Sequence, residues 1–257
     1  MATKTASRRT RSEKNDSIRI VPIRLPYPSL EAAPAANMTY RGGPLLTGVQ
    51  VFTIFWGPAW QTAPVSDQVG KLNQFFDFIL TSQLIDQMSE YNRPGKKIGH
   101  GKRIGTLTIT KPALKHSITD GAIQSALQQL ITGKKVPKPT ANTLYFIYMP
   151  PGVKVTQGGS GSCTAFCGYH DSINGKIFYA VMPYPGCQGC TGALAEFDAL
   201  TSTSSHELCE AITDPIPGQG WYDDVHGEIG DICAWQTRTL GPYTIQLEWS
   251  NQKGACI

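Results

Sequence analysis

Short runs of β-branched and aromatic residues alternate along the chain with stretches in which apolar residues recur every three or four positions. The two most apolar runs are VQVFTIFW at residues 49–56 and NTLYFIYM at residues 142–149, and each stops at a proline-containing turn. The predicted strands are residues 49–56, 104–110, 142–149, 176–184 and 243–249. The predicted helices are residues 66–91, with a break at residues 81–82, 120–132 and 194–213. This alternation predicts an α/β domain of two or three layers with parallel strand pairs.

One domain is expected, because the chain has 257 residues, of which 40% are hydrophobic and 16% charged, and can therefore bury a core. Residues 1–38 are basic at first and rich in proline later. They are predicted to form a disordered tail in front of a domain over residues 39–257.

The formal net charge of +4 hides an uneven distribution. Residues 1–24 carry 7 basic and 2 acidic groups, whereas residues 192–257 carry 2 basic and 10 acidic groups. The small net charge gives no reason to expect a nucleic-acid partner. No apolar run approaches the roughly 18 residues needed to span a bilayer, so no membrane partner is expected. The basic start has no apolar stretch behind it, so no signal peptide is predicted.

The segment SHELCEAITDP at residues 205–215 falls on the last predicted helix and carries the residues best suited to chemistry. His206 and Glu210 are four apart, so they share one face of the helix and can bind one Zn²⁺. Glu207 can take a proton from a metal-activated water, as the Glu of H-E-x-x-H does. Here Glu210 replaces the second His of that motif. The alternative is a solvated helix face, since His and Glu often fall at this spacing by chance.

An acidic segment follows this helix and offers further metal ligands. Glu228 is predicted to complete the zinc site, and Asp231 to orient His206 through its second ring nitrogen. Exchanging the roles of Glu228 and Asp231 fits the spacing almost as well. The competing prediction is a structural Ca²⁺ ion, bound among the carboxylates of Asp214, Asp223, Asp224, Glu228 and Asp231.

Two further histidines are candidate site residues. His226 is a candidate catalytic donor to the transition state, and its alternative is an ordinary loop position. His170 can join a metal site because it follows a pair of cysteines, but a structural role is favoured. The segment FCGYHD around it is expected to be a loop.

The chain has seven cysteines. Four of them form C-x3-C…C-x2-C, which suits either a four-thiolate zinc site or two disulfides: Cys163, Cys167, Cys187 and Cys190. Cys233 and Cys256 raise the count to six, which favours three disulfides. Cys209 is left over and is expected on the buried side of its helix as an inert thiol. Disulfides favour an oxidising compartment, whereas the lack of a signal peptide argues against one.

Four runs of the chain resemble the EXORDIUM-like (phosphate-induced protein 1) family and its microbial relatives: YRGGPLLTGVQVFTIFWGPAW, FCGYHD, YAVMPYPGC and SSHELCEAITDP…WYDD…GEIGDIC. The resemblance extends from about residue 40 to the C-terminus. The family's pattern falls on His206, Glu207, Glu210, Glu228, Asp231 and Cys233. Plant members are secreted to the cell wall and have no settled biochemical activity. The resemblance therefore implies an extracellular protein and strengthens the site without naming a substrate.

These features predict a zinc-dependent hydrolase, of metallopeptidase type, with a zincin-like mixed sheet flanked by helices. Zn²⁺ would polarise the scissile carbonyl and Glu207 would activate water. The expected substrate is a polypeptide, added as a strand beside the helix, or a cell-wall component. The main alternative is a non-catalytic cell-surface or carbohydrate-binding protein stabilised by metal. A glycosidase using Glu207 and Glu228 ranks lower.

Overall fold

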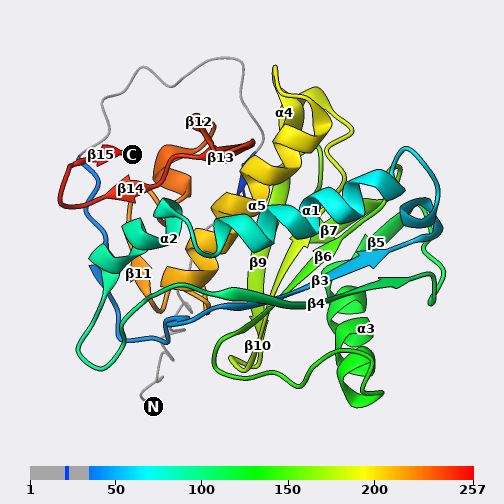
Figure 1. The fold of residues 1–257 in the computed structure, drawn as a ribbon, viewed down its shortest axis with the longest axis horizontal. Coiled ribbons are helices and arrows are strands. Elements are labelled where there is room, and N and C mark those ends of the chain that lie inside the picture. The colour runs from blue at the N-terminus through cyan, green and yellow to red at the C-terminus, as the bar shows by residue number, and fades with distance from the viewer. Residues whose placement is uncertain (1–20, 23–34) are drawn as a thin grey trace, which may run out of the picture.

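A six-stranded mixed sheet runs through the middle of the molecule in the computed structural model, which describes residues 21–22 and 35–257 (Figure 1). Its strands, in spatial order, are β1 (Val21–Pro22), β9 (Phe166–Ile173), β10 (Ile177–Met182), β6 (Thr143–Tyr148), β3 (Gln50–Trp56) and β4 (Lys102–Ile109). The last four are parallel, whereas β9 is antiparallel to β10 and β1 is antiparallel to β9. Of the predicted tail, residues 1–20 and 23–34 lie outside the described residues.

Helices cover both faces of this sheet, which is why its central strands are apolar on both sides. All six residues of β6 are buried. Leu144, Phe146 and Tyr148 pack with α1 (Ser66–Ile79) and α5 (Glu196–Thr213). The alternate residues Tyr145 and Ile147 pack with α3 (Asp120–Thr132) on the opposite face. The mixed α/β architecture expected from the sequence is thus confirmed.

Helix α5 is enclosed on all sides, although much of its sequence is polar. Every residue from Ala199 to Thr213 is buried. One side of the helix contacts β9 and β10, and another contacts β13 (Tyr243–Gln246), which forms a hairpin with β12 (Thr237–Leu240) (Figure 1). The C-terminal part of the chain therefore forms a third layer that covers the helix carrying the H-E-x-x-E sequence.

The remaining elements are short and lie mostly around the rim. The short helices are η1 (Pro58–Gln61), α2 (Gln83–Gln87), η2 (Met88–Tyr91), α4 (Gln188–Thr191) and η3 (Asp231–Cys233). The short strands are β2 (Thr39–Tyr40), β5 (Ser117–Thr119), β7 (Lys154–Gln157), β8 (Ser160–Gly161), β11 (Trp221–Tyr222), β14 (Trp249–Ser250) and β15 (Ala255–Cys256). No helix in the described part of the chain combines the length and apolarity that a membrane crossing requires.

One predicted element is wrong in kind. The segment FCGYHD, expected to be a loop, belongs to β9, an eight-residue strand with five consecutive buried residues at its start. Cys, Gly and His carry little strand propensity, so local sequence does not reveal this strand. Pairing with β10, which joins Tyr179 to Asp171 and Ala180 to His170, gives the segment its extended conformation.

Six of the seven cysteines form disulfides, as the cysteine count predicted. The pairs are Cys163–Cys187, Cys167–Cys190 and Cys233–Cys256. Cys163 lies just before β9 and Cys167 within it, and they are joined to Cys187 just before α4 and Cys190 within α4, so those thiols are not free to bind zinc. Cys209 is the free cysteine among the described residues and is buried, as expected.

Candidate metal centre

Three separate parts of the chain bring acidic and imidazole side chains together around α5. The helix supplies His206, Glu207 and Glu210, and β9 supplies His170. The segment between β11 and η3, with η3 itself, supplies Glu228 and Asp231. Apart from the partly buried Asp231, each of these side chains is at most 1% exposed.

Two glycines allow these elements to approach so closely. A Cβ at Gly168 on β9 would lie 2.7 Å from Cγ2 of Thr203 and 3.0 Å from Oε1 of Glu207. A Cβ at Gly230 would lie 2.6 Å from Nδ1 of His206. Contacts of 2.6 and 2.7 Å are too short for a Cβ, so glycine at both positions permits the strand and the acidic segment to contact α5 directly.

A first set of candidate ligands consists of His206, Glu210 and Asp231, whose ligand atoms all lie within 4.8 Å of one another. Nε2 of His206 forms an ion pair at 2.9 Å with Oε1 of Glu210, one helical turn away. The backbone N–H of Asp231 donates to the same oxygen of Glu210 at 3.2 Å. This contact holds η3 against the helix.

The other ring nitrogen of His206 meets Gln246 rather than the predicted Asp231. Nε2 of Gln246 lies 2.7 Å from Nδ1 of His206 and also donates to the carbonyl oxygen of Gly230 at 2.9 Å. Gln246 reaches this position because β13 packs along α5, a contact that no local pattern could reveal. Sequence reasoning therefore missed the residue that orients the ring.

A second set consists of His170, Glu210 and Glu228, again with ligand atoms within 4.8 Å of one another. Nδ1 of His170 lies 3.1 Å from Oε2 of Glu207 and 3.4 Å from Oε2 of Glu210. Its Nε2 lies 3.1 Å from the carbonyl oxygen of Asp214 and 3.5 Å from Oε1 of Glu228. The role favoured for His170 from the sequence was structural, whereas the fold directs its ring into the carboxylate cluster.

The structure thus brings together all four predicted ligands, His206, Glu210, Glu228 and Asp231, together with the predicted base Glu207. It divides the two downstream carboxylates between two sets that share only Glu210. His226 belongs to neither set. Its Nδ1 lies 2.8 Å from Oδ1 of Asp223 on the loop between β11 and η3.

Several buried polar atoms of the cluster have no hydrogen-bond partner in the described part of the chain. They are Oε1 of Glu207 and both carboxylate oxygens of Glu228. Buried polar atoms are normally paired, because an unpaired one loses its solvation without compensation. The carboxyl groups outnumber the two imidazoles. A cation bound among these atoms would therefore offset part of the negative charge and give the unpaired oxygens a partner.

The electrostatics of the cluster show how strongly the groups interact. Burial lowers the pKa of His206, but the carboxylates of Glu210, Glu207 and Asp231 outweigh this and raise it to about 10. Burial raises the pKa of Glu210, but the interactions with His206 and His170 outweigh this effect and lower the pKa to about 2. Burial is the main cause that raises the pKa of Glu228 well above its usual value. The buried carboxyl groups thus interact strongly with one another and with only two imidazoles.

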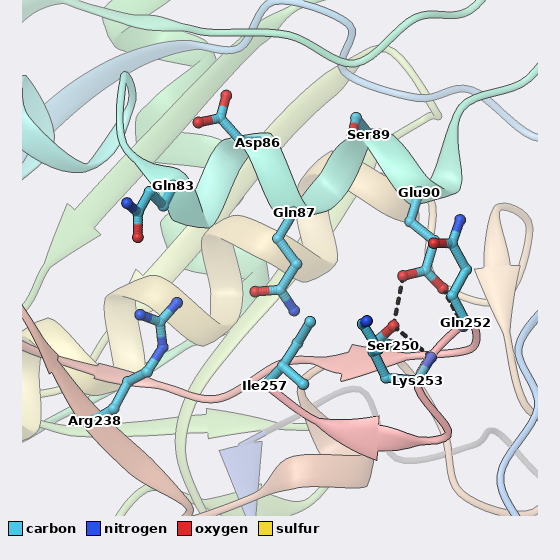
Figure 2. Close-up of a pocket in the computed structure, with 10 residues that line it drawn as sticks. All are labelled: Gln83, Asp86, Gln87, Ser89, Glu90, Arg238, Ser250, Gln252, Lys253 and Ile257. Carbon is cyan, nitrogen blue, oxygen red and sulfur yellow. Dashed lines mark hydrogen bonds between the residues drawn. The ribbon is translucent and has the colours of Figure 1, made fainter.

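An open groove on the surface is separate from this cluster. It has a volume of about 650 Å³ and lies between α2–η2 and the C-terminal strands (Figure 2). Both of its acidic groups are already paired. Glu90 accepts hydrogen bonds from Oγ of Ser250 at 2.6 Å and from the backbone N–H of Gln252 at 2.8 Å, and Asp86 lies 2.8 Å from Nε2 of His100. No residue of the two ligand sets lines this groove.

Comparison with known proteins adds no family assignment. No family model matches the chain, and no curated protein matches it.

Proposed function

We propose that this protein is a zinc-dependent hydrolase of metallopeptidase type, with the ion bound by His206, Glu210 and Asp231. The contact between Nε2 of His206 and Oε1 of Glu210 carries the proposal, because these two buried groups of metal-ligand type are held 2.9 Å apart on one face of α5. Two ligands of one tetrahedral Zn²⁺, each at about 2.0–2.2 Å, lie about 3.3 Å apart. The pair is about 0.4 Å closer than this spacing, so a bound ion would move the two atoms slightly apart.

Gln246 supports this assignment by fixing the orientation of the ring. Its Nε2 lies 2.7 Å from Nδ1 of His206 and donates to the carbonyl oxygen of Gly230. Its Oε1 accepts from the backbone N–H of Trp235 at 3.4 Å, so both ends of the amide are held. The contact keeps the imidazole turned so that Nε2 faces Glu210.

Glu207 is the general base in this proposal. It precedes Glu210 by three residues, and its Oε1 is buried without a hydrogen-bond partner among the described residues, so it can accept a proton from water. Burial raises the pKa of Glu207, and His170 lowers it in part. A raised carboxyl pKa brings a base closer to neutral pH. Zn²⁺, when bound, would polarise the scissile carbonyl.

The zincin-like fold and the EXORDIUM-like family belong to the same proposal. Support for the fold comes from the mixed sheet, in which the antiparallel strand β9 lies beside the helix carrying H-E-x-x-E. Support for the family comes from two positions of its motif, His206 and Asp231. They are 25 residues apart in the chain, and their side chains come together in one set of candidate ligands. The pairing of β1 with β9 supports a polypeptide substrate, since it demonstrates that an extended segment fits along β9.

The second candidate function is a non-catalytic protein that keeps the ion for stability. The burial of the cluster favours it: His206 and Glu207 are both 0% exposed, so a substrate has no direct access to them in this conformation. A hydrolase would need the acidic segment or the N-terminal strand to move before substrate binds.

Elemental analysis and peptide hydrolysis together separate these functions. We expect zinc in the unmodified protein and in Glu207→Gln, with hydrolysis of a peptide library reduced by about 10²–10⁴-fold in that variant. His206→Ala should lose the ion, whereas the control His100→Ala, at an exposed position outside both ligand sets, should keep both ion and activity. Zinc without hydrolysis in every sample would favour the non-catalytic protein. Absence of zinc from every sample would overturn both.

A further inference from the structure

We propose that the protein holds a second divalent cation, bound by His170, Glu228 and Oε2 of Glu210, so that Glu210 bridges two ions. The proposal rests on the first ion at His206, because the bridge requires both. It assigns a ligand role to His170, which lies outside the H-E-x-x-E helix, and a separate place to Glu228.

The orientation of His170 is the first observation. Nε2 of its ring lies 3.1 Å from the carbonyl oxygen of Asp214, which can only accept a hydrogen bond. Nε2 therefore carries a proton. Nδ1 faces the carboxylates of Glu207 and Glu210, so a cation bound there would take the place of the proton that Nδ1 shares with them. A backbone carbonyl that accepts from one nitrogen is the usual partner of a histidine that binds metal through the other.

The carboxylate of Glu228 is the second observation. Both of its oxygens are fully buried, and neither has a hydrogen-bond partner within residues 21–22 and 35–257. The nearest cationic group is His170, whose Nε2 lies 3.5 Å from Oε1 of Glu228, and that nitrogen donates to Asp214 instead. Glu228 thus has both oxygens available inside the cluster, a state that a bound cation would stabilise.

The position of Glu210 connects the two sets. Its Oε1 faces His206 at 2.9 Å, and its Oε2 faces His170 at 3.4 Å. The second distance is close to the roughly 3.3 Å expected between two ligands of one tetrahedral ion. The two imidazoles do not fall in one set of ligand atoms, so a single ion in this arrangement would leave one of them without metal. Two ions sharing one carboxylate use both.

The ligand types favour a transition-metal ion over Ca²⁺. Each set contains one imidazole and two carboxylates, a combination that suits Zn²⁺, whereas Ca²⁺ takes six to eight oxygen ligands. Two divalent cations would also neutralise more of the buried carboxylate charge than one. We therefore assign Zn²⁺ to both positions.

The test is the number of zinc ions per chain, measured by elemental analysis after zinc loading and dialysis. We expect two ions in the unmodified protein, one in His170→Gln, one in Glu228→Gln and two in the control His226→Ala. Glutamine preserves the size of the glutamate and one of its two acceptor oxygens, so Glu228→Gln removes the charge with little change in packing. Far-ultraviolet circular dichroism checks that every variant is folded.

A titration of the metal-free protein with Co²⁺, followed by visible absorption, gives an independent count with no reference to activity. We expect the signal to saturate at two equivalents, and at one equivalent in Glu228→Gln. One ion in the unmodified protein that survives in His170→Gln and Glu228→Gln would overturn the second site and leave the proposed function intact. One ion that is lost in His170→Gln but kept in His206→Ala would instead overturn the proposed zinc site.

Discussion

The imidazole of His206 packs directly against the backbone of Gly230, so closely that a Cβ at Gly230 would lie 2.6 Å from Nδ1. The carbonyl oxygen of Gly230 also accepts a hydrogen bond from Gln246, the residue that contacts the same ring nitrogen. Gly230 precedes Asp231, so one backbone position sets the distance between two candidate ligands from distant parts of the chain.

We expect Gly230→Ala to lower zinc affinity by at least about tenfold, because the added methyl group must displace either His206 or η3. Overpacking should also lower the free energy of unfolding by about 1–3 kcal/mol. Zinc titration and urea unfolding measure the two effects. Gly70→Ala is the control: Gly70 is exposed within α1 and a methyl group there would meet no other atom within 4 Å, so alanine should raise stability by about 0.5–1 kcal/mol. Unchanged zinc affinity in Gly230→Ala would contradict the argument.

Asp223 should make stability depend on pH. Burial raises its pKa, but N–H groups of Asn37, Val225 and His226 donate to the carboxylate and lower the pKa to about 2. The folded-state pKa lies below the unfolded value of about 3.9, so the stabilisation is complete above pH 4 and is lost as the pH falls towards 2.

We therefore expect Asp223→Asn to cost about 1–2 kcal/mol of unfolding free energy at pH 7 and progressively less between pH 4 and pH 3. Urea unfolding at several pH values gives the measurement. Asp224→Asn is the matched control, because Asp224 is 89% exposed in its pair with Arg41 and should contribute little. A cost for Asp223→Asn that stays constant down to pH 3 would show that the carboxylate is not the cause.

The Cys233–Cys256 disulfide holds η3 near β15, and Cys233 lies two residues after Asp231. Replacing both cysteines by alanine should lower the free energy of unfolding by about 3 kcal/mol, as expected for a closed segment of this length. Zinc affinity should fall as well, since η3 carries a candidate ligand. The Cys163–Cys187 pair closes 24 residues instead of 23, so its removal should cost similar stability and leave zinc affinity nearly unchanged. Equal zinc affinity in both double variants would show that η3 does not contribute to zinc binding.

The short strand β1 protects one end of β9. Val21 and Pro22 pair with Gly168 and Phe166, so a chain shortened to begin at residue 35 leaves this stretch of β9 without its partner strand. We expect hydrogen exchange at residues 166–168 to rise by about tenfold or more in the shortened chain. Exchange in β6, at the centre of the sheet, should stay the same and serves as the internal control. Equal protection in both chains would mean that β1 does not stabilise this edge.

Local patterns predicted most of the α/β core. The helix expected over residues 120–132 has these bounds in the structure, because Thr119 caps it and its apolar residues follow the helical period. The strands at residues 49–56 and 142–149 are likewise confirmed within one residue. In both cases the signal lies within a few neighbouring residues.

The strand β9 had no such signal, and for this reason the sequence did not predict His170 as a ligand. The side chain of a residue in a loop has no direction that the sequence can predict. On a strand, Gly168 and His170 point to the same face because they are two apart, and this face packs against α5.

The chain's own order of residues determined that His206, Glu207 and Glu210 lie on adjacent turns of one helix, because helical spacing is a local property. The same holds for the nearness of Glu228 to Asp231 along the chain. Their separation into a set with His170 and a set with His206 depends on contacts between β9, α5, η3 and β13, which are far apart in sequence. Such contacts arise from packing of the whole core, so folding alone placed Glu210 between two imidazoles.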